Sequence, residues 1–152
     1  MADANIFGPV DGVLAMELGV GDVILVEALV LVVVLANFAT RKIAHDRHRS
    51  QAQQGAEAIT RFLPHEVLNV VLVLGAFYYM TVHHHAGMVL SVLVLGLFFA
   101  DFFEFEARKV EARRDIPLDR PKGAITAGML VLAYAAFQAL FFLVEGPFNA
   151  IV

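Results

Sequence analysis

The chain has 152 residues, of which 59% are hydrophobic and 17% charged, and it has no cysteine and a formal net charge of −4. One small soluble core cannot bury so much apolar surface, so we expect a single transmembrane domain over residues 1–152. The missing cysteines exclude disulfides, thiolate chemistry and iron–sulfur clusters, and the acidic balance argues against nucleic acid as a partner.

The first twenty residues are acidic and only partly apolar. Residues 1–9 lack the basic start of a signal peptide, so we expect the first apolar run to be retained as a membrane span. Residues 10–19 combine Val10 and Leu14 with Asp11 and Glu17, which suits a short amphipathic segment on the outer surface. An extended tail fits these residues equally well.

Four apolar runs follow, and each is about long enough to cross roughly 30 Å of hydrocarbon as a helix. They cover residues 23–40, 67–82, 88–103 and 125–144. Pro64 suits the first turn of the second helix, and Pro121 precedes the fourth. The third helix is expected to continue past the membrane to residue 114, because Pro117 then stops it.

The basic residues predict the orientation of the spans. All eleven Lys and Arg residues fall within 41–61 and 108–122. The positive-inside rule then places both basic loops in the cytoplasm and both termini outside. The sequence therefore predicts an all-α four-helix bundle in the cell membrane, built from two hairpins.

The polar side chains of the spans recur at alternating spacings of three and four residues, which places them on one face of each helix. We expect these faces to meet inside the bundle, because an unpartnered polar group facing lipid is costly. On the fourth span this face runs through Leu130. Ala135 and Ala139 form a small-residue pair on another face of that span, as do Gly96 and Ala100 on the third. The predicted polar core is Asn37, His65, Asn69, Tyr79, Asp101, Tyr134 and Gln138.

The turn His83-His84-His85 is the candidate metal site, since imidazole is a common ligand of zinc, copper and nickel. His83 and His85 would have to bind from an extended turn, helped by Glu27 or Glu145. The alternative for the turn is a polar helix end. Glu27 itself is a candidate for ion or proton handling, or for a packing role bonded to a tyrosine or Gln138.

No cofactor is expected. Haem needs histidines at matched depth on facing helices, but His65 and His83 lie on the same helix, roughly 27 Å apart. Glycine-rich phosphate loops, GxSxG and HExxH are absent from the sequence, so we expect no enzymatic activity.

The first basic loop is expected to lie against the bilayer. Arg41, Lys42, Arg47 and Arg49 follow directly on the first span, where such residues contact anionic lipid headgroups. Docking of a cytoplasmic partner is the alternative. Asp101 is expected to be an interfacial carboxylate, or to pair with Arg108.

The segments LANFATRKIAH, LPHEVLN and RRDIPLDRPKGAITAG resemble, in their layout, small four-span membrane proteins of halophilic archaea that have no assigned function. The acidic outer segments and the absence of cysteine and tryptophan fit this resemblance, which covers nearly the whole chain. It implies the four-span fold and carries no activity or site residue.

Two functions are consistent with these patterns. The first is a non-enzymatic membrane module that forms a homo-oligomer or joins a larger membrane complex. The second is a small cation or proton transporter that uses Glu27, His83 and Asp101. The apolar middle of the predicted faces favours the first, because it interrupts any polar path across the membrane.

Overall fold

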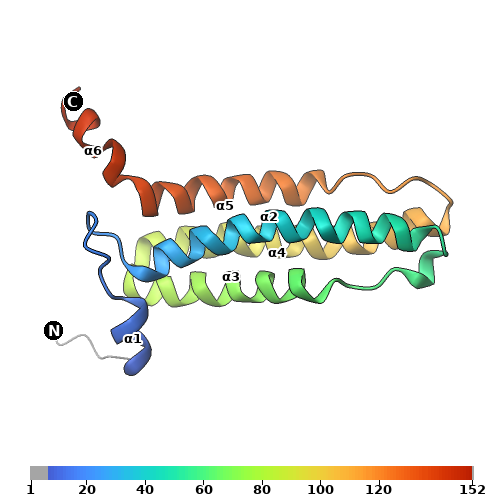
Figure 1. The fold of residues 1–152 in the computed structure, drawn as a ribbon, viewed down its shortest axis with the longest axis horizontal. Coiled ribbons are helices and arrows are strands. Elements are labelled where there is room, and N and C mark those ends of the chain that lie inside the picture. The colour runs from blue at the N-terminus through green and yellow to red at the C-terminus, as the bar shows by residue number, and fades with distance from the viewer. Residues whose placement is uncertain (1–6, 152) are drawn as a thin grey trace.

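The computed structural model describes residues 7–151 and shows an all-α bundle (Figure 1). Its helices are α1 (Pro9–Leu14), α2 (Leu25–Ala52), the 3-10 turn η1 (Ala56–Ala58), α3 (Leu63–Val82), α4 (His84–Arg113), α5 (Lys122–Leu140) and α6 (Phe142–Asn149). Residues 1–6, which belong to the predicted outer tail, lie outside the described part.

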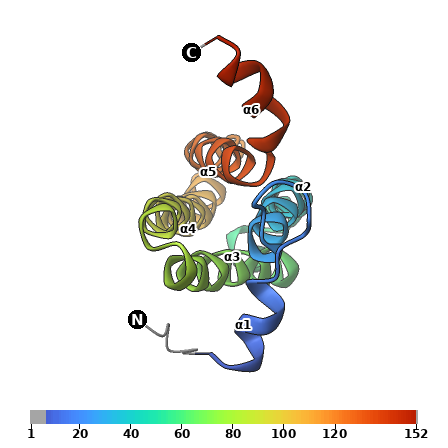
Figure 2. The same ribbon diagram turned by 90° about the vertical axis from the view of Figure 1, so that its left-hand side faces the viewer.

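Helices α2, α3, α4 and α5 form a ring when the bundle is viewed from one end (Figure 2). Each packs against its two neighbours, and α2 lies between α3 and α5. Helices α1 and α6 project from one end of the bundle, which we call the terminal end (Figure 1). The α2–α3 and α4–α5 connections, with the basic residues, lie at the other, here called the loop end.

Three of the described helices are long and apolar enough to cross a membrane, namely α3, α4 and α5. The predicted first span lies in α2, which is not one of the three. Its uncharged stretch between Glu27 and Arg41 is only 13 residues long. The packing of α2 against α3 and α5 nevertheless places this stretch beside their apolar segments.

The helix ends differ from the predicted spans in three places. Helix α2 continues twelve residues beyond residue 40, to Ala52, because no proline or glycine interrupts it. The link between the second and third helices is His83 alone, and α4 already begins at His84. The predicted fourth span, 125–144, is divided, since α5 ends at Leu140 and α6 is a separate helix.

The predicted inner faces of the first two spans are the buried faces of α2 and α3. The buried residues of these helices include Glu27, Val30, Val34, Asn37 and Arg41 on α2, and His65, Asn69, Leu72, Ala76 and Tyr79 on α3. On α4 the buried face includes Ser91, Val94, Phe105 and Arg108.

The predicted face of the fourth span is wrong by about one residue. Helix α5 buries Ala124, Gly128, Val131, Ala135 and Ala139, whereas Leu130 is 55% exposed. Close packing explains the difference, because a Cβ atom at Gly128 would lie 2.9 Å from the ring of Phe38. Small residues therefore decide which side of α5 faces the bundle. Tyr134 and Gln138 lie at its margin, half-buried.

Candidate functional site

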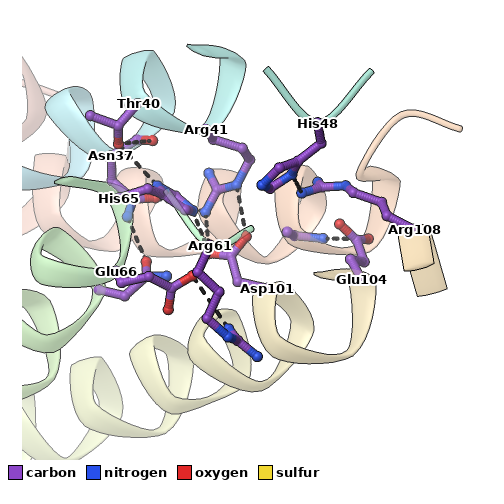
Figure 3. Close-up of polar contacts among 12 residues, drawn as sticks. Asn37, Thr40, Arg41, His48, Arg61, His65, Glu66, Asp101, Glu104 and Arg108 are labelled. Carbon is purple, nitrogen blue, oxygen red and sulfur yellow. Dashed lines mark hydrogen bonds and ion pairs between the residues drawn. The ribbon is translucent and has the colours of Figure 1, made fainter. Parts of the chain in front are cut away.

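A network of polar side chains lies between α2, α3 and α4 towards the loop end (Figure 3). We call it the Arg41 cluster, and its members are Asn37, Thr40, Arg41, His65, Asn69 and Asp101. Helix α2 contributes three of them, because Thr40 and Arg41 stand three and four residues after Asn37, one helical turn further along. The cluster thus joins residues that are up to 64 positions apart in the chain.

The centre of the cluster is a two-point ion pair. Arg41 Nε and Nη2 donate to the two carboxylate oxygens of Asp101 over 3.1 and 2.7 Å. Both side chains are at most 9% exposed, so the two charges compensate each other away from solvent. The Arg41 guanidinium also lies 5.4 Å from the ring centre of Phe38, at cation–π distance.

Two amides extend the ion pair towards the middle of the bundle. Arg41 Nη2 donates to Asn37 Oδ1 over 2.7 Å, and Asn37 Nδ2 donates to Asn69 Oδ1 over 2.7 Å. Asn37 and Asn69 are 1% and 3% exposed. Their bonds satisfy amide groups that would otherwise be left unpaired between apolar helices.

His65 connects the ion pair to α2. Its Nε2 lies 3.3 Å from Asp101 Oδ2, and its Nδ1 lies 2.9 Å from the hydroxyl of Thr40. That hydroxyl is also placed to donate to the Asn37 carbonyl over 3.1 Å. When it does so, both ring nitrogens of His65 donate and the ring is cationic. When it turns towards Nδ1 instead, a neutral ring makes the same contacts.

A second pair lies further towards the loop end. His48 Nε2 is 2.9 Å from the carbonyl oxygen of Thr60, and Arg108 Nη1 is 2.9 Å from His48 Nδ1. A carbonyl only accepts and a guanidinium only donates, so His48 carries its proton on Nε2 and is neutral. Burial and the nearby Arg108 charge lower the pKa of His48 to about 4.

Glu104 connects α4 to the start of α5. Its Oε1 accepts a hydrogen bond from the backbone N–H of Ala124 over 3.0 Å. This N–H belongs to the first turn of α5, where helix donors lack partners within the helix. Glu104 therefore caps a helix that Pro121, at its N-cap, cannot cap by itself.

The terminal end holds a separate pair. Tyr79 donates its hydroxyl proton to Glu27 Oε1 over 2.6 Å, and the backbone N–H of Ile24 donates to Glu27 Oε2 over 3.0 Å. Glu27 thus closes the first turn of α2 and joins it to α3. Of the partners weighed for Glu27, the structure shows the tyrosine.

The structure places the candidate metal ligands Glu27 and His83 on one pocket at the terminal end, but His85 does not line it. His83 lies between α3 and α4 with its ring 5.4 Å from the ring of Tyr79, and His85 is exposed in the first turn of α4. Residues 7–151 contain no group of three or more His, Asp or Glu side chains placed to hold a metal ion. The prediction that His83, His85 and Glu27 bind a metal is therefore not supported by a set of neighbouring ligands.

Arg41 lies deeper than the predicted surface contact with lipid headgroups. It is 3% exposed and paired with Asp101, since the buried face of α2 continues one turn past the apolar run. Of the other three, Lys42 pairs with Asp46 over 3.1 Å on the surface, and Arg47 lies 5.6 Å from the ring centre of Phe62. Asp101 pairs with Arg41 and not with Arg108.

Sequence reasoning missed the functions of Arg108, His48 and Glu104. Arg108 does stand on the predicted inner face of the third helix, at the spacing that also includes Asp101. That spacing was a usable signal of burial. His48 continues the buried face of α2 in the same way, beyond the expected end of the span.

The fold and its polar contacts define a class of protein: a helical bundle with three membrane-length apolar helices and buried polar clusters at its two ends. The chain belongs to the family described as Domain of unknown function (DUF7313), whose model matches residues 2–152. No curated protein and no solved structure matches it.

Proposed function

We propose that the protein is a four-span integral protein of the cell membrane that acts as a structural or accessory module, without catalytic activity of its own. One observation carries this proposal. The Arg41 cluster and the Glu27–Tyr79 pair lie towards opposite ends of the bundle, separated by a buried apolar layer. That layer comprises Val30, Val34, Leu72, Ala76, Val94, Leu97 and Val131.

The apolar layer argues against conduction. An ion crossing the bundle would meet few polar groups in this layer, chiefly the buried hydroxyl of Ser91 on α4, at a cost of several kcal/mol. The polar groups on either side bond mainly to one another, which is the arrangement expected of contacts that fix helix packing. The buried polar residues therefore support a structural function better than transport.

The placement of the loops supports a four-span topology. Helix α2 packs along α3 and α5, so a membrane that contains those helices also surrounds α2. Both basic connections lie at the loop end, and the positive-inside rule directs that end to the cytoplasm (Figure 1). Both termini are then outside. As part of this proposal, the resemblance to four-span proteins of halophilic archaea favours the same number of spans.

A partner surface is available on α4. Gly96 has no side chain or neighbouring backbone within 4 Å of the place where a Cβ would stand. Val92, Phe99 and Phe103, on the same helix, are exposed and apolar. Small residues beside apolar ones permit close helix contacts in a bilayer. This face supports self-association or entry into a larger membrane complex.

Single cysteines test the topology, because the natural chain contains none. In intact cells, we expect an impermeant maleimide to label Asn149→Cys, at the exposed end of α6. It should not label Gln54→Cys, in the exposed α2–α3 connection, until the cells are permeabilised. Labelling of Gln54→Cys in intact cells would contradict the proposed orientation.

Flux measurements separate the structural module from the transporter. Vesicles containing the purified protein should leak protons and monovalent cations no faster than empty vesicles or vesicles with Asp101→Asn. If the natural protein gave faster flux and Asp101→Asn abolished it, the result would contradict the structural function and indicate transport.

A further inference from the structure

A cavity of about 780 Å³ opens at the loop end, between α2 and the segment that leads into α5. Arg41, Lys42 and Arg49 line it from α2, and Arg120 lines it from the opposite side. The basic residues thus surround a defined space and are not simply spread over a surface.

The carboxylates of this cavity are already paired. Asp46 accepts from Lys42 over 3.1 Å, and Asp119 accepts from Lys122 over 2.9 Å. Within residues 7–151, Arg49 and Arg120 form no ion pair. Two guanidinium groups on opposite walls therefore remain available for an anion.

A buried donor at the cavity also lacks a partner. Arg41 is 3% exposed, and its Nη1 has no hydrogen-bond partner among the described residues, although Nε and Nη2 are bonded. An unpaired donor of a buried charged group is costly. His45, another lining residue, likewise has a buried Nδ1 without a partner. A ligand with acceptor oxygens would satisfy the Arg41 donor, while His45 Nδ1 donates or accepts according to its tautomer.

The remaining wall is apolar. Phe38, Leu118, Pro121 and Ile125 line the cavity beside the cations. Phe38 and Ile125 lie on the apolar sides of α2 and α5, at the depth where the proposed membrane begins. A ligand that fits both parts of this wall has an anionic group next to hydrocarbon.

We propose that this cavity binds the phosphate group of an anionic membrane lipid. Arg49 and Arg120 contact the phosphate oxygens from two sides, and Arg41 Nη1 donates to it from the base. The acyl chains lie along Phe38 and Ile125. Phosphate suits the site because its several oxygens accept hydrogen bonds from different directions at once. The proposal rests on the membrane placement proposed above.

Lipid binding by the full chain in a neutral detergent tests the site. We expect a fluorescent phosphatidylglycerol to bind with an apparent Kd that is about fivefold weaker in Arg49→Gln and in Arg120→Gln. Arg47→Gln is the matched control, since Arg47 lies two residues from Arg49 but packs against the ring of Phe62. Its Kd should stay within about twofold of the natural value.

Competitors identify the source of the phosphate. Unlabelled phosphatidylglycerol should displace the probe, whereas phosphatidylcholine should displace it poorly. Displacement by millimolar inorganic phosphate supports the site and assigns it to a free phosphate. Equal weakening in Arg47→Gln, or equal displacement by phosphatidylcholine, would overturn the proposal.

Alkaline extraction of membranes separates this proposal from the proposed function. If the natural protein stays in the membrane but the Arg49 and Arg120 variants bind lipid normally, only the phosphate site is wrong. If alkali releases the protein, the membrane placement is wrong, and so is the lipid site, which depends on that placement.

Discussion

Arg41 and Asp101 carry opposite charges between helices that are otherwise largely apolar at their contacts. Each charge is tolerable there only because the other lies within 2.7 Å of it. Removing one partner leaves an uncompensated buried charge, whereas removing both removes the two opposite charges together and costs Asn37 and His65 one contact each. The pair therefore specifies which turns of α2 and α4 face each other, whatever its net contribution to stability.

We expect Asp101→Asn to lower the free energy of unfolding by about 3 kcal/mol or more, because Arg41 keeps its charge. The double variant Arg41→Met with Asp101→Leu should recover most of this loss. Unfolding by SDS in mixed micelles measures both. Asp46→Asn, which breaks an exposed pair, is the control and should cost less than about 1 kcal/mol. A double variant as unstable as the single one would contradict this account.

His48 makes stability depend on pH. Its pKa is about 4 in the folded protein against 6.5 for an unperturbed ring, so the unfolded chain binds more protons between these values. The contribution of His48 to the free energy of unfolding should be fully present above pH 6.5. It should fall by roughly 2 kcal/mol towards pH 4, allowing for screening by solvent. Melting in detergent across this range measures the slope.

The control for this prediction is a histidine on the surface. His48→Gln should flatten the pH dependence, while His84→Gln, at an exposed position, should leave it unchanged. His45 adds a slope of the same sign in all three proteins, since burial and nearby arginines lower its pKa. Equal slopes in His48→Gln and the natural protein would show that another group is responsible.

At the scale of helices, the sequence was sufficient for three inner faces and insufficient for the fourth. The rotation of α2 follows from Glu27, Asn37 and Arg41, because a polar group within a span is costly unless it faces other helices. On α5 the same reasoning selected Tyr134 and Gln138. Tyr134 and Gln138 are only half-buried at the margin of that face, and packing of Gly128 against Phe38 decided instead.

The pairing of the polar residues could not be read from their spacing. Periodicity places both Arg41 and Arg108 on inner faces, and it allows either arginine to pair with Asp101. Which one does depends on the relative height of α2 and α4. That height follows from the one-residue link at His83 and from the length of the η1 connection, which no sequence pattern fixes.

Gly87 is the tightest approach in the α3–α4 hairpin. A Cβ atom there would stand 2.1 Å from Met80 Cα and 2.2 Å from Met80 N, both of which are backbone atoms. Because these backbone atoms cannot move away as a flexible side chain can, Gly87→Ala should lower the free energy of unfolding by about 3 kcal/mol or more. Gly96→Ala, on the open face of the same helix, should be neutral or gain up to about 1 kcal/mol. Thermal melting compares the two, and equal stability would contradict the contact.

The whole molecule turns large apolar side chains outward along its length. On α4, Val92 and Phe103 are each 66% exposed and Val110 is 43% exposed. In water these positions would be equivalent surface sites. In the proposed membrane placement they differ, because residues 88–103 would lie in hydrocarbon and Val110 beyond it.

Lysine substitutions distinguish the two environments. Val92→Lys should reduce membrane insertion at a cost of about 3 kcal/mol, the cost of a charge near the bilayer centre. Val110→Lys should insert normally. Glycosylation-site mapping or alkaline extraction of newly made protein measures insertion. Equal tolerance of both substitutions would argue for a water-soluble bundle.

The one-residue link at His83 has a consequence for how the chain enters a bilayer. Residues 67–100 contain no Asp, Glu, Lys or Arg, so α3 after its first turn and the first half of α4 form a continuous uncharged hairpin. In the proposed topology, only the histidine turn would have to cross the membrane with this hairpin. Translocation of α1 and α6 would bring Asp11 and Glu145 through hydrocarbon, but the hairpin would require no such transfer. With that topology, the absence of charge would allow the central hairpin to insert in one step, before α2 and α5 pack against it.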